Sequence, residues 1–246
     1  MRDYQNYLFD LYGTLVDIKT DERDPEVYHK LRRYFWFNGA SYEEKELYDA
    51  FFEEISLEEE RRKEERREVE IDIRNVFYEL YARKDVYPSE RTVEKTALRF
   101  RKYSRKELRL YTGAIELLRT LKRKGKTILL VSNAQAVFTN EELKKLHLDT
   151  VFHGYYLSSD FGYKKPDELF YKKILKDNDL IPSDCLMIGN DRYSDVYGAK
   201  RLGMDTYYIR SSLSPKKDYP VKATYEQRGM NLNTLLKKLL DTRPVR

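Results

Sequence analysis

The stretch from Tyr7 to Leu15, which reads Tyr-Leu-Phe-Asp-Leu-Tyr-Gly-Thr-Leu, places the strongest constraint on the fold of this chain. An apolar, β-prone run ends at Asp10, and a glycine turn and a hydroxyl follow at Gly13 and Thr14. In open α/β sheets ligands bind beyond the carboxyl ends of the strands, so an acid at such an end is placed for chemistry. The same acid can also simply cap a turn. The rest of the chain must decide between these interpretations.

From Tyr111 onwards, short apolar runs alternate with segments of helical period. Continuous apolar runs are typical of parallel strands that are covered on both faces. We therefore predict an α/β fold with a doubly wound, mostly parallel sheet. The polar tail after Ser211 is expected to end in an amphipathic helix. The strands predicted here are Thr127–Val131, Val151–Leu157, Cys185–Ile188 and Thr206–Ile209, the last of these being the final strand that the pattern indicates.

Residues 17–108 have a different hydrophobic pattern. The polar segment Asp17–Arg23 has neither period and is predicted to be a connector, after which apolar residues recur at helical spacing. We expect a helical block at 17–108, inserted into a core formed by 1–16 and 109–246. Trp36 and its aromatic neighbours are expected to pack between block and core, or to line a pocket.

Composition narrows the class of protein. The chain has 246 residues, of which 41% are hydrophobic and 36% charged, and its net charge of +5 is spread among interleaved signs. Nucleic-acid binding is therefore not implied. The single cysteine, Cys185, cannot form an internal disulfide, and no apolar run suits a signal peptide or a membrane span. We expect a cytoplasmic protein that neither enters nor crosses a membrane, with Cys185 as a packing residue.

Polar residues follow each predicted strand. Because parallel strands bring their carboxyl ends to one rim, these residues are expected to converge. An aspartate such as Asp10 can attack phosphorus or carbon and form a covalent intermediate, while Ser132 holds a substrate oxygen and Lys165 balances charge. The carboxylates of Asp10, Asp191 and Asp195 would suit Mg²⁺.

Four motifs in this order resemble those of the haloacid dehalogenase superfamily. The resemblance implies that Asp10 is the nucleophile, Ser132 the oxyanion-binding hydroxyl and Lys165 the charge-neutralising amine, with Asn133 beside the substrate. It also implies that block 17–108 is a cap able to close over the substrate, and that the backbone carbonyl of Tyr12 joins the three aspartates around Mg²⁺. Thr14 is expected either to bond to Asp10 or to cap the turn. The motifs are Asp10-Leu-Tyr-Gly-Thr14, Ser132-Asn133, Lys165-Pro166-Asp167 and Gly189-Asn-Asp191-xxx-Asp195.

Tyr12 departs from the phosphatases that the chain resembles, which usually carry a second aspartate there as a general acid and base. An unperturbed tyrosine has a pKa near 10 and does not readily shuttle a proton near neutral pH. Asp-x-Tyr-Gly-Thr is the version found in 2-haloacid dehalogenases, and Tyr171 falls where those proteins tend to place a substrate-binding tyrosine. Aromatic packing is the alternative role for both tyrosines. Asp191 instead favours a metal site, as in the phosphatases, unless its carboxylate pairs with Arg192.

Three functions stay open at this point. The preferred one is Mg²⁺-dependent hydrolysis of a small phosphomonoester through an aspartyl-phosphate. The second is a metal-independent dehalogenase that forms an ester on Asp10 and holds a substrate carboxylate with a cap arginine, for which Arg32, Arg33 and Arg101 are candidates. The third is a non-catalytic binding or regulatory protein. In each case the expected partner is a small molecule, and the protein is a monomer or a homodimer.

Overall fold

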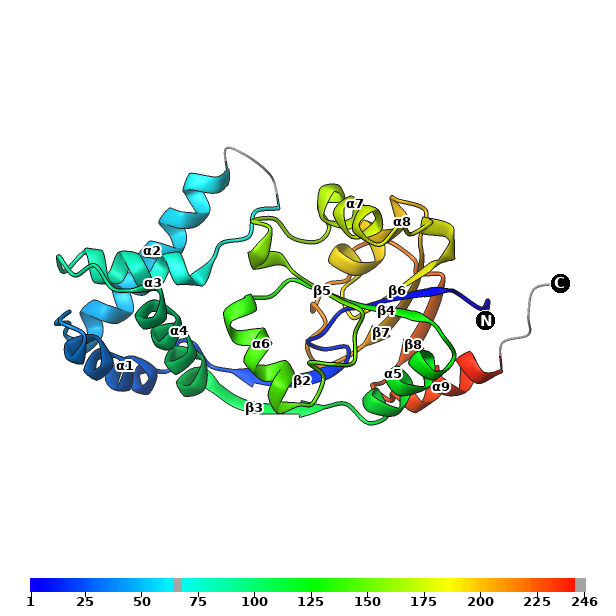
Figure 1. Ribbon diagram of the computed structural model, residues 1–246, viewed down its shortest axis with the longest axis horizontal. Helices are drawn as coiled ribbons and strands as arrows, with labels where there is room; N and C mark the ends of the chain where they lie inside the picture. The colour runs from blue at the N-terminus through cyan, green and yellow to red at the C-terminus, as the bar shows by residue number, and fades with distance from the viewer. Residues whose placement is uncertain (64–67, 242–246) are drawn as a thin grey trace.

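The computed structural model describes residues 1–63 and 68–241. Residues 64–67 of the expected helical block and 242–246 at the end of the expected core lie outside the described part. A six-stranded sheet forms the centre of the molecule, and all of its neighbouring strands are parallel (Figure 1). In spatial order the strands are β5 (Gly154–Leu157), β4 (Thr127–Ser132), β1 (Asn6–Phe9), β6 (Cys185–Gly189), β7 (Asp205–Arg210) and β8 (Tyr225–Arg228).

Helices cover both faces of this sheet because successive residues of a strand point to opposite sides. Tyr7 and Phe9 of β1 pack in one apolar cluster with α5, α6 and α9, whereas Leu8 packs in another with α7 and α8. The α/β fold with a parallel sheet is thereby confirmed. The helices are α5 (Ala114–Arg123), α6 (Ala136–Lys145), α7 (Glu168–Asp177), α8 (Gly198–Lys200) and α9 (Leu232–Leu240), with short helical turns at Ser158–Asp160, Pro182–Asp184 and Arg192–Tyr197.

Two polar segments contain strands that the sequence pattern does not indicate. In the tail after Ser211, β8 pairs with β7 at the edge of the sheet. The predicted connector Asp17–Arg23 overlaps β2 (Val16–Thr20), which pairs antiparallel with β3 (Arg105–Leu110). This two-stranded ribbon joins the sheet to the helices inserted after β1, and it spans the predicted boundaries at 16/17 and 108/109. The division of the chain at those residues stays a prediction.

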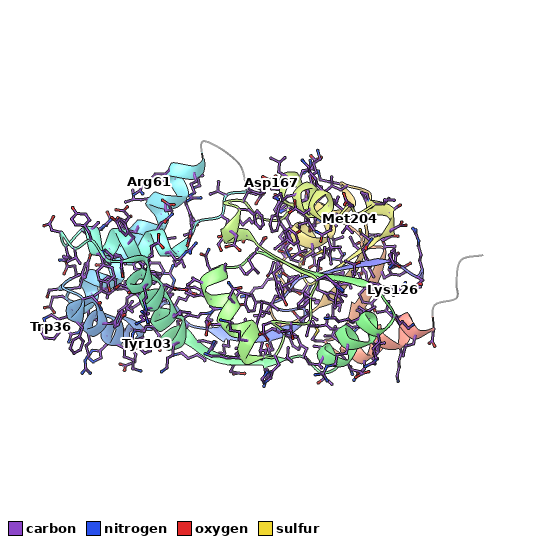
Figure 2. All side chains as sticks on the ribbon, viewed as in Figure 1. Trp36, Arg61, Tyr103, Lys126, Asp167 and Met204 are labelled. Carbon is purple, nitrogen blue, oxygen red and sulfur yellow. The ribbon has the colours of Figure 1, made fainter. Side chains whose placement is uncertain are left out.

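Four helices lie between β2 and β3 and share an apolar cluster of their own, to which Phe138 of α6 also belongs (Figure 1). Phe35 is buried in this cluster, but Trp36 is 63% exposed. Figure 2 shows Trp36 at the outer end of this bundle, away from the sheet, so Trp36 does not pack between block and core, and the hollow that it lines lies on the bundle itself. The helices are α1 (Pro25–Phe37), α2 (Glu44–Lys63), α3 (Ile73–Ala82) and α4 (Glu90–Ser104).

A second connection between the helical bundle and the core runs close to Lys165. The backbone N–H of Glu70 donates to the carbonyl of Gly162 at 3.1 Å, and that of Lys164 donates to the carbonyl of Glu68 at the same distance. The chain between α2 and α3 is thus bonded to the loop that carries Lys165. No helix within residues 1–63 and 68–241 is long and apolar enough to cross a membrane.

Candidate active site

Asp10 stands directly after the central strand β1, and its loop is shaped by a tight turn. The backbone N–H of Asp10 donates to the carbonyl of Ile188 on β6 at 2.9 Å, which extends the sheet by one residue. Gly13 has a φ of +83°, a conformation that other residues rarely adopt. The turn brings the Thr14 hydroxyl to 3.2 Å from Oδ2 of Asp10, which it donates to. Of the two roles considered for Thr14, the structure has the bond to Asp10.

Ser132 and Lys165 meet the other oxygen of the same carboxylate. Ser132 is the last residue of β4, the neighbour of β1, and its hydroxyl donates to Oδ1 of Asp10 at 3.1 Å. The Lys165 ammonium donates to the same oxygen at 2.9 Å and to the backbone carbonyl of Val131 at 2.8 Å. The strand ends therefore bring Asp10, Ser132 and Lys165 together as the sequence predicted.

Lys165 also joins Asp10 to Asp195. Its Nζ donates to Oδ1 of Asp195 at 2.7 Å, and both side chains are almost completely buried. Burial alone would lower the pKa of Lys165, but the charges of Asp10 and Asp195 outweigh it, so the pKa is raised and the ammonium stays charged. Burial raises the pKa of Asp195, and Lys165 opposes that shift.

Asn133 holds Lys165 rather than facing outward for a substrate. Its side-chain nitrogen donates to the Lys165 carbonyl at 2.9 Å, and its oxygen accepts from the Lys165 N–H at 2.8 Å. Both polar atoms of the amide are used in this reciprocal pair. Asn133 is thus a positioning residue for Lys165, which differs from the substrate-binding role expected for it.

Tyr171 is likewise not exposed to a substrate. Its side chain is fully buried on α7, and its hydroxyl donates to the backbone carbonyl of Ser194 at 2.8 Å. Burial, with the nearby aspartates, raises the pKa of Tyr171 well above its usual value, so the hydroxyl stays protonated. Through its hydrogen bond to Ser194 the Tyr171 hydroxyl holds the backbone of the turn that leads to Asp195. The packing alternative fits this tyrosine, and a substrate contact does not.

Asp191 and Arg192 are both engaged, though not with each other. Oδ1 of Asp191 accepts from the backbone N–H of Tyr193 at 2.8 Å and so caps the turn that carries Asp195. Arg192 binds the carboxylate of Glu226 at 2.9 Å and that of Asp218 at 3.3 Å. The expected alternative of an Asp191–Arg192 pair is therefore wrong.

Asn190, which the sequence placed only among the strand ends, lies beside Oδ2 of Asp10. It follows Gly189, the last residue of β6, and its amide nitrogen donates to Oδ2 of Asp10 and to the carbonyl of Tyr12, each at 3.3 Å, while its oxygen accepts from the Ser211 hydroxyl at 3.3 Å. Within residues 1–63 and 68–241, no group of three His, Cys, Asp or Glu side chains is arranged to hold a metal. The Asp10 carboxylate and the Tyr12 carbonyl are nevertheless oxygens of the kind that Mg²⁺ prefers.

Tyr12 points its hydroxyl away from Asp10 and into a buried ionic cluster. The hydroxyl donates to Oε2 of Glu142 on α6 and lies 3.1 Å from the Thr139 hydroxyl. Burial, with the charge of Glu142, raises the pKa of Tyr12 well above its usual value. Tyr12 thus keeps its proton and donates it in a hydrogen bond to Glu142. The side chain is therefore poorly placed to exchange a proton with a group bound at Asp10.

Glu142 is the functional candidate that the sequence missed. It is 1% exposed, and it accepts from Arg101 at 2.8 Å and from Arg105 at 3.0 Å. Burial alone would raise the pKa of Glu142, but Arg101, Tyr12 and Arg105 together lower it, so the carboxylate is ionised. A single buried glutamate on an amphipathic helix gives no signal of such partners. The signal that exists is only that position 142 falls on the buried face of α6.

Of the three candidate cap arginines, only Arg101 is shown by these contacts to reach the core. Arg32 and Arg33 line a hollow on the bundle with Trp36, which Figure 2 places at the outer end. The guanidinium of Arg101 lies 5.8 Å from the ring centroid of Tyr12 and is bound by Glu142. The Arg101 guanidinium is therefore already paired and is not free to bind a substrate carboxylate.

The sequence is similar to those of known phosphatases over part of its length. A glyceraldehyde 3-phosphate phosphatase from Pyrococcus furiosus is 34% identical over 103 residues, which are 42% of this chain and 43% of that protein. A 5'-nucleotidase from Pseudomonas aeruginosa is 33% identical over 106 residues, covering 43% of this chain and 48% of that one. The matched stretch thus spans less than half the length of these curated relatives.

Solved structures match over almost the whole chain. An HAD phosphatase from Thermococcus onnurineus superposes with a TM-score of 0.61 at 23% identity and covers 100% of both chains. A 2-haloacid dehalogenase from Pseudomonas syringae pv. Tomato DC3000 gives a TM-score of 0.66 at 17% identity, covering 96% of this chain and 98% of that one. At these identities the likeness shows the fold. The sequence profile described as haloacid dehalogenase-like hydrolase matches residues 7–209, and the chain therefore belongs to that family.

Proposed function

We propose that the protein hydrolyses a small phosphomonoester through a covalent aspartyl-phosphate on Asp10. The observation that carries this proposal is the hydrogen bonding of Oδ1 of Asp10 by Ser132 at 3.1 Å and by Lys165 at 2.9 Å. A carboxylate nucleophile next to a hydroxyl and an ammonium suits a substrate with anionic oxygens. The phosphatase names of the sequence relatives support the same choice.

The reaction has two displacements at phosphorus. A carboxylate oxygen of Asp10 attacks, the ester P–O bond breaks, and the alcohol leaves with a proton taken up from water. Water then attacks the phosphoryl group, the bond to Asp10 breaks, and inorganic phosphate and the free carboxylate are regenerated. Ser132 and Lys165 donate hydrogen bonds to the phosphoryl oxygens, while Asn133 and Asp195 keep Lys165 in place.

Mg²⁺ belongs to this proposal as the cofactor. The groups that would hold it are the Asp10 carboxylate and the Tyr12 carbonyl, both of which lie next to the Asn190 amide. When bound, the ion would neutralise part of the charge on the phosphoryl group. Asp191, which the sequence favoured as a ligand, uses its carboxylate to cap the turn at Tyr193 instead. Asp195 faces Lys165 and is better placed to support the site than to ligate directly.

Tyr12 narrows the class of substrate that we expect. Its hydroxyl donates to Glu142, so the site has no carboxyl group at position 12 to protonate a leaving alcohol. We expect faster turnover of phosphate esters with stabilised leaving groups, such as aryl phosphates, than of alkyl phosphates. A plot of rate against the pKa of the leaving group should therefore fall steeply. The cytoplasmic location and the monomeric or dimeric state stay predictions from the sequence.

The test is phosphate release from a panel of small phosphomonoesters in the presence of Mg²⁺. The panel should include glyceraldehyde 3-phosphate, a nucleoside 5'-monophosphate and an aryl phosphate. Asp10→Asn should reduce release by about 10³-fold or more, because the nucleophile is lost. Absence of release across the panel, or release that survives Asp10→Asn, would overturn the proposal.

A second candidate is a dehalogenase-like hydrolase that forms an ester on Asp10 and uses no metal. The observation that favours it is the tyrosine at position 12, whose hydroxyl is withdrawn towards Glu142. A halide leaving group needs no proton, so this arrangement would not hinder it. Chloride release from 2-chloropropionate in the presence of EDTA tests this candidate. Turnover of either substrate class that is lost in Asp10→Asn would exclude a non-catalytic binding protein.

A further inference from the structure

Residues 68–73, which we call the linker, lead into helix α3 of the bundle and lie against the core beside the turn after β5 (Figure 1). Val69 of the linker pairs with Tyr163 in an isolated antiparallel bridge, next to the two backbone hydrogen bonds described above. Tyr163 stands two residues before Lys165. The backbone of the linker is therefore bonded to the loop that carries the Lys165 ammonium.

The side chain of Glu70 binds the core at two further points. Its Oε2 accepts from the hydroxyl of Ser158, a buried residue in the turn after β5, at 2.5 Å. Its Oε1 accepts from Nε2 of Gln135, just before α6, at 3.1 Å. Burial raises the pKa of Glu70, and the hydrogen bonds from Ser158 and Gln135, with the charge of Lys164, oppose that shift. A carboxylate of the linker is thus partly removed from water and held by two side chains of the core.

Gln135 uses both ends of its amide on the same linker. Nε2 also donates to the carbonyl of Ile71 at 2.7 Å, and Oε1 accepts from the backbone N–H of Ile73 at 2.8 Å. Since Oε1 faces a donor and Nε2 faces two acceptors, one orientation of the amide satisfies all three bonds. Gln135 follows Ser132 by three residues, so the linker is bonded to the loop after Ser132 as well.

The two loops that the linker contacts are also bonded to each other. Oγ of Ser158 accepts from the backbone N–H of Ala134 at 2.9 Å. The amide of Asn133 forms the reciprocal pair with the backbone of Lys165 that is described above. A change at the Glu70 contacts therefore reaches both loops and can pass from one to the other.

We propose that Glu70 is a positioning residue, which couples the helical bundle to the loops of Ser132 and Lys165 and orders these two donors while the linker is seated on the core. The catalytic part of this inference rests on the proposed function. Catalytic groups must be held within about 0.5 Å of their productive geometry, which depends on the residues that support them. Glu70 supplies such support to both loops at once, because its two carboxylate oxygens bind one donor from each side.

The test compares amide hydrogen exchange and phosphate release in the whole protein. Glu70→Ala removes two hydrogen bonds to a charged group, so exchange of the Lys164 and Ile73 amides should quicken by about tenfold or more. The kcat for an aryl phosphate should fall by about fivefold or more, while KM changes by less than about threefold. The reason is that the variant loses the alignment of Ser132 and Lys165 and keeps the groups themselves.

Ser158→Ala and Ser159→Ala form a matched pair of variants. Each hydroxyl accepts from one of the two backbone N–H groups that flank Gln135, at 2.9 and 2.8 Å, and Ser158 in addition donates to Glu70. Ser158→Ala should change exchange at the same two amides, and kcat, in the direction of Glu70→Ala. Ser159→Ala should change neither. Glu70→Ala and Ser158→Ala together should lose less than the sum of their effects, because both break the same hydrogen bond.

Unchanged exchange at Lys164 and Ile73 in Glu70→Ala would overturn the inference, and so would equal effects of Ser158→Ala and Ser159→Ala. Quickened exchange with the kcat of the wild type would make Glu70 a structural contact and would overturn its positioning role. If no phosphomonoester is turned over, the proposed function fails, whereas quickened exchange would still support the coupling of the bundle to both loops. Circular dichroism shows whether each variant is folded. Glu70→Gln, which keeps one acceptor oxygen, replaces Glu70→Ala if that variant is not, and should show smaller effects in the same direction.

Discussion

Two buried ionic clusters flank the loop from Asp10 to Thr14, and their charges are arranged in opposite ways. In the first cluster one cation, Lys165, lies between two carboxylates at 2.9 and 2.7 Å. In the second, one carboxylate, Glu142, lies between two guanidinium groups at 2.8 and 3.0 Å. Each central group is almost completely buried, so each depends on its partners for compensation.

The two clusters differ in which elements supply the charges. The first draws on residues that follow β1, β5 and β6, all fixed by the parallel sheet. The second joins α6, on the core, to α4 and β3, which belong to the helical bundle and the ribbon. A movement of the bundle would break the ion pairs of the second cluster directly, whereas it would reach the first only indirectly, as through the backbone bonds of Gly162 and Lys164. The comparison therefore separates a cluster at the proposed nucleophile from one that joins the bundle to the core.

Lys165→Met should have the largest effect, because it leaves two buried carboxylates without their cation. Removal of one partner of a buried ion pair costs about 3–5 kcal/mol, and we expect a loss of stability in that range. Activity should fall by at least about 10²-fold, since the ammonium no longer offsets the charge that develops in the reaction. Urea unfolding and phosphate release measure the two effects.

Lys173→Met is the matched control for that change. Lys173 pairs with Asp177 at 2.7 Å on the exposed side of α7, where its side chain is 44% exposed. Surface pairs contribute less than about 1 kcal/mol, so this variant should unfold close to the wild type. Equal losses in the two variants would contradict the view that burial makes the Lys165 cluster special.

Glu142→Gln should have a smaller effect on stability and a distinct effect on motion. The amide can still accept from one arginine, and the arginines are partly exposed, so the cost is about 1–3 kcal/mol. Hydrogen exchange should quicken at the end of α4 and in β3, because the ionic contacts of these segments with α6 are weakened. Lys165→Met should not change exchange in those segments.

The neighbouring residue provides the control for Glu142. Glu141 pairs with Lys144 at 2.8 Å and is 44% exposed, so Glu141→Gln removes the same charge from the same helix at its surface. We expect no change in exchange at α4 and less than about 1 kcal/mol in stability. If Glu141→Gln and Glu142→Gln behave alike, the second cluster does not tie the bundle to the core.

The pH dependence of stability sharpens the same comparison. The pKa of Glu142 is lowered in the folded protein from its ordinary value of 4.5, as Arg101, Tyr12 and Arg105 outweigh the effect of burial. Its contribution is therefore present above pH 4.5 and is lost as the pH falls through the folded pKa. The difference in unfolding free energy between the wild type and Glu142→Gln should shrink in acid. A difference that grows as the pH falls would contradict this assignment.

The sequence predicted that Asp10, Ser132 and Lys165 would meet, because each comes after a predicted apolar strand and parallel strands bring their carboxyl ends to one rim. The pairing of Lys165 with Asp195 was not predicted, since Asp195 was expected among the metal ligands. The strands themselves are identified by continuous apolar runs. The contact of Asn190 with Asp10 was not predicted, because it depends on one amide bonding both to Asp10 and to the Tyr12 carbonyl, which no pattern in the sequence records.

The second cluster and the ribbon could not be predicted for a different reason. Tyr12, the pair Arg101 and Arg105, and Glu142 come from three separate parts of the chain, with no spacing that links one part to another. The strands β2 and β3 are polar and short, and each is stabilised by a partner about ninety residues away, so neither shows a period of its own. Contacts made by charged residues across distant segments are set by the packed structure rather than by local sequence.

Tyr12→Phe should have the smallest effect and shows whether the clusters are linked through the loop that lies between them. The change removes one donor from Glu142, which keeps both arginines, so we expect about 1 kcal/mol in urea unfolding. Combined with Glu142→Gln, the losses should be less than additive, because both changes break the same hydrogen bond. Combined with Lys165→Met, they should add, since the Tyr12 hydroxyl faces Glu142 and Thr139 rather than the Lys165 cluster. Non-additivity with Lys165→Met would instead show that the loop transmits the position of the bundle to Asp10.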